Sequence, residues 1–412
     1  AILILSLVLS CFFPLIFENL AFPLGLIYYV FFAYVVGSLL GYFYNYQMFL
    51  LQADQKNYVV DSYFQSFNLV KILLQALIVF YYQSFMAWVS LELIFSLLFS
   101  LFLRKRIAKE YPWLKEDKST DRSILKKYPE LIKKVKQITA HKFGSFVTNG
   151  TDQILIFIFI SIETVAFFGN YQLVFGKLSA LINNAFAGTS AGIGNLVAEK
   201  DAPTISKVFW EMMALRFFIA GFLAITLLYT VDHFIFLWLG LKYVLGHNIL
   251  LLFLINLFLM QIRVPVDHFK DAFGLFADTW APLVQSVLNL GISLFLVHSF
   301  GLVGILLGTF VSLSLIVMVW RPFYVYKYGF KQSFWRYWVE IAKMTVALLG
   351  SYFIIRFMVP PIPLQEGLGS FGLLAVFGIK MFFISALVYC PILFLMSKGY
   401  RNLCKRLYQL VK

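Results

Sequence analysis

Long apolar runs separated by short polar segments are the dominant pattern of the chain. A helix that crosses a membrane needs about 20 mostly apolar residues. Twelve runs approach this length, and none alternates polar and apolar positions as a membrane β-strand would. We therefore predict an all-α polytopic membrane protein with 12 transmembrane helices. They are expected at roughly 1–17, 24–50, 63–82, 86–103, 142–161, 164–195, 206–230, 247–263, 278–297, 301–320, 337–358 and 371–396.

The amino-acid composition indicates the same class of protein. Hydrophobic residues make up 61% of the chain and charged residues 13%, whereas soluble domains average roughly 45–50% and about 25%. This excludes a soluble enzyme, a nucleic-acid-binding module and a disordered chain. The three cysteines lie far apart, and no two of the five histidines have metal-ligand spacing. We therefore expect no disulfide framework, no metal centre and no cofactor.

The basic residues predict the orientation of the helices. If successive connections face opposite sides, one side holds 28 of the 34 Lys and Arg residues, and the other holds only Lys242 and Arg356. The positive-inside rule then makes the basic loops and the C-terminus cytoplasmic. The basic loop at 104–141, with one short helix after Pro129, would attract anionic lipid headgroups. Ala1 would lie near the cytoplasmic face, so we expect an even number of helices, most simply two, to precede it.

Polar residues form stripes along single faces of several apolar runs. Interhelical hydrogen bonds explain any single Asn or Gln. A charge at bilayer depth, however, costs at least about 2.5–3.5 kcal/mol. Polar faces on so many helices therefore favour a water-filled central cavity. The sequence contains no repeated selectivity-filter segment of the kind that a channel would need. The candidate cavity residues are Glu92, Asn149, Asp152, Asn170, Lys177, Asn184, Arg216, Gln285, Asn289 and Lys380.

Two junctions give a weak indication of internal duplication. The segment 53–58 is followed by Gln65 and an Asn-Leu pair, and the segment 272–278 is followed by Gln285 and another Asn-Leu pair. The junctions are six expected helices apart. Two six-helix lobes would produce this spacing, and paired repeats around a midplane cavity are usual in secondary transporters.

Two longer segments carry a resemblance to a known family. One runs from Asp152 through Gly169-Asn170-Tyr171 to Gly192-Ile193-Gly194-Asn195-Leu196, and the other from Asp271 through Asn289-Leu290 to Gly301-x-x-Gly304-x-x-x-Gly308-Thr309. Together they resemble the Wzx-type lipid-linked oligosaccharide flippases of the multidrug/oligosaccharidyl-lipid/polysaccharide exporter superfamily. Small residues at such spacings let helices approach closely.

The resemblance implies a specific domain organisation. The family pattern has 14 helices, arranged as two pseudo-symmetric six-helix lobes around a central cavity plus a final helix pair. With two helices expected upstream, residues 1–103 would be the remainder of the N-terminal lobe and 142–320 the C-terminal lobe. Residues 337–412 would supply the extra helix pair and a basic cytoplasmic tail.

The resemblance also implies a function. The chain would move undecaprenyl-pyrophosphate-linked oligosaccharides across the bacterial cytoplasmic (inner) membrane by alternating access, for surface polysaccharide biosynthesis. Lys177 and Arg216 would meet the phosphate charge, and Asp152 would pair with one of them or carry a coupling H⁺ or Na⁺. Asn and Gln side chains would bind sugar hydroxyls. The expected partners are the lipid-linked oligosaccharide, membrane lipids, a polysaccharide polymerase and glycosyltransferases, but no nucleic acid.

Two other functions fit the sequence less well. A drug or cation antiporter of the same superfamily would need an acidic cavity, whereas the deep charges comprise three basic and two acidic residues. A membrane polymerase or glycosyltransferase would carry a large outer loop with catalytic charge, and the connections 231–246 and 359–370 hold only Asp232, Lys242 and Glu366. Because no nucleophile–base pattern or phosphate-binding loop occurs, the chain is not expected to be an enzyme.

Overall fold

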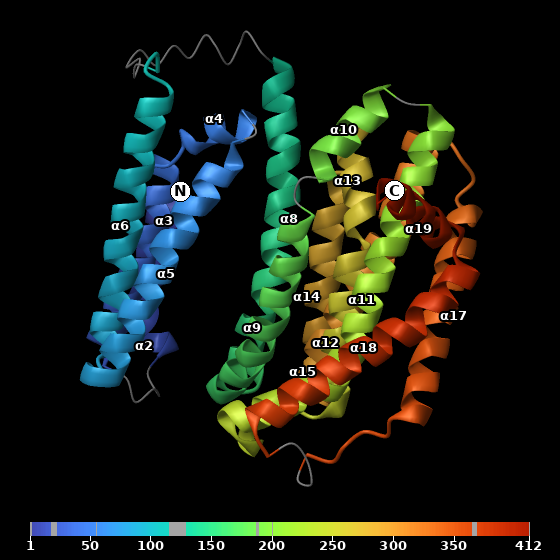
Figure 1. Cartoon of the computed structure of the whole chain (residues 1–412). Helices are drawn as coiled ribbons and strands as arrows, with labels where there is room; N and C mark the ends of the chain where they lie inside the picture. The colour runs from blue at the N-terminus through green and yellow to red at the C-terminus, as the bar shows by residue number, and fades with distance from the viewer. Residues whose placement is uncertain are drawn as a thin grey trace. The chain divides into compact units, whose positions relative to one another are not determined.

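The computed structural model describes residues 2–17, 23–54, 56–114, 129–186, 189–199, 201–364 and 369–411. Every regular element within these ranges is a helix, and no strand occurs among them. The chain divides into two compact units, Ala1–Arg122 (unit 1) and Ser123–Lys412 (unit 2), and each is described by itself (Figure 1).

Unit 1 is a small bundle in which α3 and α5 both pack along α6. Helix α5 ends at Tyr82, the next residue, Gln83, adopts a left-handed conformation (φ 47°), and α6 begins after Ser84. The Ser84 hydroxyl accepts a hydrogen bond from the backbone N–H of Ala87, as N-cap residues commonly do. The helices are α1 (Ile2–Cys11), α2 (Phe13–Ile16), α3 (Leu24–Phe43), α4 (Met48–Ala53), α5 (Asn57–Tyr82) and α6 (Phe85–Glu110).

Unit 2 contains the remaining helices. In its first half these are α8 (Pro129–Phe159), α9 (Ile162–Ala185), α10 (Thr189–Glu199), α11 (Ala202–Leu239), η1 (Leu241–Tyr243), α12 (His247–Ile262) and α13 (Val264–Ala272). The second half contains α14 (Trp280–Phe300), α15 (Leu302–Ser312), η2 (Leu313–Trp320), α16 (Arg321–Tyr324), η3 (Val325–Phe330), α17 (Trp335–Met358), α18 (Phe371–Met396) and α19 (Lys398–Val411).

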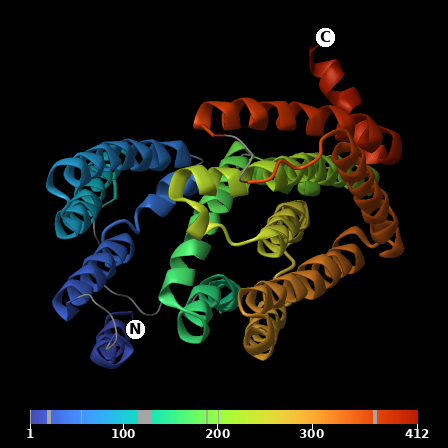
Figure 2. The same cartoon turned by 90° about the horizontal axis from the view of Figure 1, so that it is seen from below.

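Helix α11 organises unit 2. It spans 38 residues and is apolar on most of its surface, so it is buried over much of its length. It packs on α12 on one side and on α18 and α19 on another. Figure 2 shows α18, in red, alongside α11, and α12, in yellow, inside the unit between α11 and α15. Phe209, Met213 and Phe217 of α11 are fully buried in the main core.

Ten helices within the described residues are long and apolar enough to cross a membrane. The chain is therefore a multi-pass, all-α membrane protein, as its composition predicts, while the number of twelve and the two-lobe arrangement stay predictions. The ten helical segments are Leu24–Phe43, Asn57–Tyr82, Phe85–Glu110, Ile162–Ala185, Ala202–Leu239, His247–Ala272, Trp280–Phe300, Leu302–Phe330, Trp335–Met358 and Phe371–Met396.

The two expected spans that are not among these ten are also helical. The run at 1–17 is divided into α1 and α2, with Pro14 in the first turn of α2. The run at 142–161 belongs to α8, which is continuous from Pro129 and includes the apolar segment Gly150–Phe159. The short helix expected after Pro129 is thus the first part of one 31-residue helix. Proline is favoured at a helix start, and no later proline interrupts α8.

Several other expected spans have different boundaries in the structure; the run at 24–50, for example, is divided into α3 and α4. The run at 164–195 is not one helix, because α9 ends at Ala185 and α10 begins at Thr189, whose N–H and hydroxyl both bond the carbonyl of Phe186. The run at 301–320 extends to Phe330 through two π-helical segments, η2 and η3. These segments flank Pro322, which lacks the N–H that a regular α-helix would use at that position.

Candidate functional site

A directed chain of hydrogen bonds connects three helices inside unit 2. The amide nitrogen of Asn289 on α14 donates to Thr309 Oγ1 on α15 over 2.9 Å. Thr309 Oγ1 in turn donates to Asp152 Oδ2 on α8 over 3.0 Å. Asn289 is fully buried and Asp152 is 8% exposed. Asp152 and Asn289 belong to two different polar stripes of the sequence, and both bond the hydroxyl of Thr309, which belongs to neither stripe.

Glycines allow this chain to form. A Cβ at Gly304 would lie 2.5 Å from the backbone oxygen of Leu296, and a Cβ at Gly308 would overlap Ser293 Oγ. Only glycine lets α15 approach α14 this closely, which is how small residues act at helix contacts in membranes. Thr309 directly follows Gly308, so the close approach places its hydroxyl between α14 and α8.

A second charged group lies beside this chain. Asp267 accepts bonds from two guanidinium groups: Arg321 Nη1 lies 2.7 Å from Oδ1 and Arg263 Nε lies 3.0 Å from Oδ2. Arg321 Nη2 also lies 3.4 Å from Gln285 Oε1. Two cations share one carboxylate, so this triad (Arg263, Asp267 and Arg321) keeps a net positive charge.

Members of both groups line one cavity of about 160 Å³ within unit 2. Amide groups, the Asp152 carboxylate and two guanidinium groups face it together with several aromatic and aliphatic side chains. This volume accommodates several water molecules. The polar lining residues are Asp152, Gln172, Asn256, Arg263, Gln285, Thr309 and Arg321.

Arg216 on α11 has neutral partners instead of a carboxylate. Its Nη1 donates to Gln261 Oε1 over 2.8 Å and to Asn183 Oδ1 over 3.1 Å, and its guanidinium lies 4.8 Å from the ring centre of Phe186. The side chain is only 3% exposed. Among the described residues, no ion pair includes Arg216 or Asp152. Within the described residues Asp152 therefore pairs with neither Lys177 nor Arg216 and accepts from Thr309 instead, while the alternative role as carrier of a coupling ion stays a prediction.

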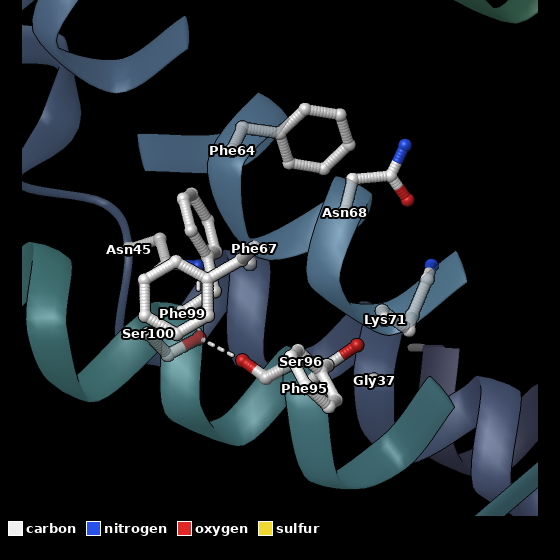
Figure 3. A pocket seen from close by; sticks show the side chains of 11 residues that line it. Gly37, Asn45, Phe64, Phe67, Asn68, Lys71, Phe95, Ser96, Phe99 and Ser100 are labelled. Carbon is white, nitrogen blue, oxygen red and sulfur yellow. Dashed lines mark hydrogen bonds between the residues drawn. The ribbon is translucent and has the colours of Figure 1, made fainter. Parts of the chain in front are cut away.

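Unit 1 holds a separate polar pocket of about 200 Å³ between α3, α5 and α6. Lys71 of α5 forms an ion pair with Glu92 of α6. Figure 3 shows Lys71 and Asn68 on α5 beside Ser96 and Ser100 of α6. A buried bond from the Asn45 amide to Ser100 Oγ (3.1 Å) extends this network to the end of α3. The polar side chains of α6 therefore face those of α5, and the ion pair of Lys71 and Glu92 joins the two helices.

The structure brings only some of the predicted site residues together. Asp152 and Gln285 line the cavity of unit 2, and Asn289 bonds the Thr309 hydroxyl that lines it, whereas Arg216 and Glu92 lie in the two other polar groups. Asn170 is half-buried, and the side chain of Asn149, on α8, lies outside the described part of the chain. The side chains of Lys177, Asn184 and Lys380 are exposed.

Sequence reasoning missed the charges that face the cavity. Arg263 and Arg321 were counted as loop charges because they follow apolar runs that were expected to end there. Helix α13 and the segment up to Phe330 instead continue the helices past those charges. The spacing of four residues between Arg263 and Asp267 was a usable signal, since such residues lie on one helical face. Thr309, the last residue of the glycine motif, was not identified as a partner of Asp152.

The described residues contain no group of three or more His, Cys, Asp or Glu side chains that could hold a metal ion. No protein-family model matches the chain, and no curated protein matches it. Function is therefore inferred from the membrane-spanning helices, the polar cavity and the resemblance described above.

Proposed function

We propose that this membrane protein is a flippase that moves lipid-linked oligosaccharides, carried on undecaprenyl pyrophosphate, across the bacterial cytoplasmic membrane. The observation that carries the proposal is the triad, in which two guanidinium groups share one carboxylate beside a cavity rich in amides. Guanidinium groups bind phosphate oxygens bidentately. An excess of guanidinium over carboxylate inside a membrane bundle suits a pyrophosphate.

In this proposal the triad exchanges partners when cargo binds. A phosphate oxygen would take the place of Asp267 at Arg321, whose contact with Gln285 is long at 3.4 Å. Gln285 would then hydrogen-bond the first sugar. Transport would proceed by an alternating opening of the helices. Helices commonly bend at π-helical turns and at prolines, which makes the segment around Pro322 the expected place for this movement.

Export in a bacterial strain that lacks its own flippase tests the proposal. Arg263→Gln and Arg321→Gln should leave folded protein in the membrane and reduce surface polysaccharide at least about tenfold. Lys343→Gln is the matched control, since Lys343 lies outside the cavity and pairs only with the nearby Glu340. Normal export by both arginine variants, at equal protein levels, would remove the triad as the cargo site.

A second test separates cargo binding from a scaffold role. Asp267→Asn leaves two guanidinium groups without their carboxylate, and an uncompensated buried charge destabilises a protein. Arg321→Gln instead leaves the balanced pair of Arg263 and Asp267. If the charges only hold the helices together, Asp267→Asn lowers the protein level, whereas Arg321→Gln keeps both protein level and export. If Arg321 binds phosphate, Arg321→Gln keeps the protein level and loses export.

One observation favours a second candidate function, an antiporter that exports cationic compounds. Asp152 Oδ1 is buried and has no hydrogen-bond partner among the described residues. A cation or proton bound there would satisfy it, either as a coupling ion of the flippase or as part of a cation exporter. Efflux of a fluorescent organic cation from intact cells distinguishes the two. Efflux that needs Asp152 but not Arg321 would favour the antiporter.

The orientation of the chain is part of the proposal. Lys242 follows one end of α11, and Lys405 belongs to α19, which packs near the other end through the ion pair of Arg406 and Glu211. Both lysines are exposed. In a cysteine-free background, Lys242→Cys should react with a membrane-impermeant maleimide in intact cells and Lys405→Cys should not. The reverse result would invert the proposed orientation.

A further inference from the structure

A second cavity in unit 2, of about 320 Å³, is lined by cations from three different helices. It lies where α11 and α17 begin and where α19 follows α18, and it shares no lining residue with the triad cavity. Lys207 of α11, Arg336 of α17 and Lys398 of α19 line it. Glu340 is the one acidic side chain among its lining residues, and it pairs with Lys343 over 2.8 Å. The cavity is therefore strongly positive.

The three cations are not engaged with carboxylates of the protein. In the described ranges, no ion pair includes Lys207, Arg336 or Lys398. Three like charges around one cavity repel one another unless an anion lies between them. Charge complementarity thus indicates an anionic ligand.

The start of α19 is held firmly against α11. A Cβ at Gly399 would overlap the backbone oxygen of Trp210, so only glycine allows this approach. Tyr400, the next residue, is buried, and its N–H donates to Ser397 Oγ over 3.3 Å. This packing places the backbone of Lys398 beside the cavity that its side chain lines. The first turn of α19 adds a partial positive charge from its free N–H groups.

The cavity also offers neutral hydrogen-bonding groups. Ser206 and Asn402 line it and provide donors. The amide oxygen of Gln332, another lining residue, is buried and has no hydrogen-bond partner among the described residues. A buried acceptor without a partner is unfavourable, because it has lost its hydrogen bonds to water. A ligand hydroxyl next to the anionic group would satisfy it.

The surface beside the cavity is apolar and exposed. Trp335 and Val339 of α17 are 77% and 51% exposed. Each directly precedes a residue that lines the cavity, Arg336 and Glu340 respectively. Leu395, three residues before Lys398, is 74% exposed. Tryptophan is enriched where a membrane meets water. Figure 1 shows α19 turning back from the end of α18 toward the start of α11. The cavity therefore lies where a phosphate headgroup and acyl chains would meet the protein together.

We propose that this cavity binds the headgroup of an anionic phospholipid with a free hydroxyl, of the phosphatidylglycerol type. Its phosphate lies between Lys207, Arg336 and Lys398, a headgroup hydroxyl donates to Gln332 Oε1, and the acyl chains cover Trp335 and Val339. Basic pockets between transmembrane helices bind anionic lipid headgroups in this way. The site is independent of the cargo that the protein carries.

Native mass spectrometry of the purified full chain tests this site. Wild-type protein in detergent, mixed with equal amounts of phosphatidylglycerol and phosphatidylcholine, should retain phosphatidylglycerol at least about tenfold more strongly. Lys207→Gln, Arg336→Gln and Lys398→Gln should each weaken this retention about fivefold, as expected for the loss of one charge-assisted hydrogen bond. Lys405→Gln is the matched control, because it removes the same charge from α19 outside the cavity, and it should retain the lipid like wild type.

Two further measurements test whether the bound phosphate belongs to a lipid and whether the position of α19 affects lipid binding. Inorganic phosphate at the same concentration should not displace the lipid. Displacement would overturn the lipid assignment in favour of a soluble phosphate. Gly399→Ala, which keeps every charge but moves α19 away from Trp210, should weaken retention as well. Equal retention by the three cavity variants and the Lys405 control, or equal retention of the two lipids, would overturn the proposal.

Discussion

Thr309 joins α15 to α8 by donating its hydroxyl hydrogen to Asp152 over 3.0 Å, while the same oxygen accepts from Asn289. A threonine hydroxyl can do both at once, and here neither role has a substitute among the described residues. One side chain therefore links α14 and α8 beside the cavity that Thr309 and Asp152 line.

The first prediction concerns this hydroxyl. Thr309→Val keeps the shape but removes the hydroxyl that the amide nitrogen of Asn289 and Oδ2 of Asp152 both bond, so the free energy of unfolding should fall by about 1–3 kcal/mol. Thr309→Ser should behave like wild type. Thr226→Val is the matched control, because the Thr226 hydroxyl bonds only the carbonyl of Phe222 in its own helix. Thermal unfolding in detergent measures the difference, and equal midpoints for the two valine variants would contradict it.

A second prediction concerns helix contact. Gly308→Ala places a methyl group on Ser293 Oγ and 2.8 Å from the backbone oxygen of Asn289, so α15 must move. We expect a loss of about 1–3 kcal/mol, as in other overpacked sites. Gly291 of α14 has no atom within 4 Å of its Cβ position, and Gly291→Ala should stabilise slightly, since glycine costs helices roughly 0.5–1 kcal/mol. Thermal unfolding of the two variants should therefore shift in opposite directions.

A third prediction concerns the ion pair of unit 1. Lys71 and Glu92 have side chains 16% and 23% exposed. Glu92→Gln leaves the lysine unpaired between helices and should lower the free energy of unfolding by more than about 1 kcal/mol. The charge-swapped double variant Lys71→Glu/Glu92→Lys should recover most of this loss. Glu340→Gln breaks a more exposed pair and should cost about 0.2–0.5 kcal/mol. A swap that recovers nothing would show that the two charges do not interact.

A fourth prediction concerns the reactivity of Cys404 on α19. Burial raises the pKa of its thiol, and Cys390 beside it raises the pKa further. Less thiolate is present at a given pH, so alkylation should be slower in the folded protein, with a pH midpoint above that of the unfolded chain. Because the pKa is higher in the folded state, the thiol contributes stability that is complete below the unfolded pKa and is lost as pH rises through the folded pKa.

Measuring the alkylation of Cys404 with iodoacetamide across pH, in a Cys11→Ser background, tests this. Cys390→Ala removes the second cause and should move the midpoint down part of the way. An unchanged midpoint on unfolding would contradict the burial of the thiol.

The local pattern of the sequence was sufficient for the class of protein. Apolar runs of membrane-spanning length have no other stable form in a bilayer than a helix, because each backbone group must be satisfied within its own segment. The helical stripes of polar residues also identified Asp152, Gln285 and Asn289, which the structure brings to one region. This worked because the side chains on one face of a helix are fixed by a spacing that any single sequence reveals.

The tertiary structure alone decided which of these groups meet and what lies between them. Arg263 and Arg321 face the cavity because their helices continue beyond the apolar runs, and this continuation depends on packing against neighbours. Lys71 meets Glu92, and Thr309 meets Asp152, across 21 and 157 residues of sequence. Such contacts follow from how closely whole helices approach, which glycines such as Gly308 set through a missing Cβ. A polar stripe in the sequence shows which face of a helix is polar. Only the packing of a second helix against that face determines which side chains the stripe contacts.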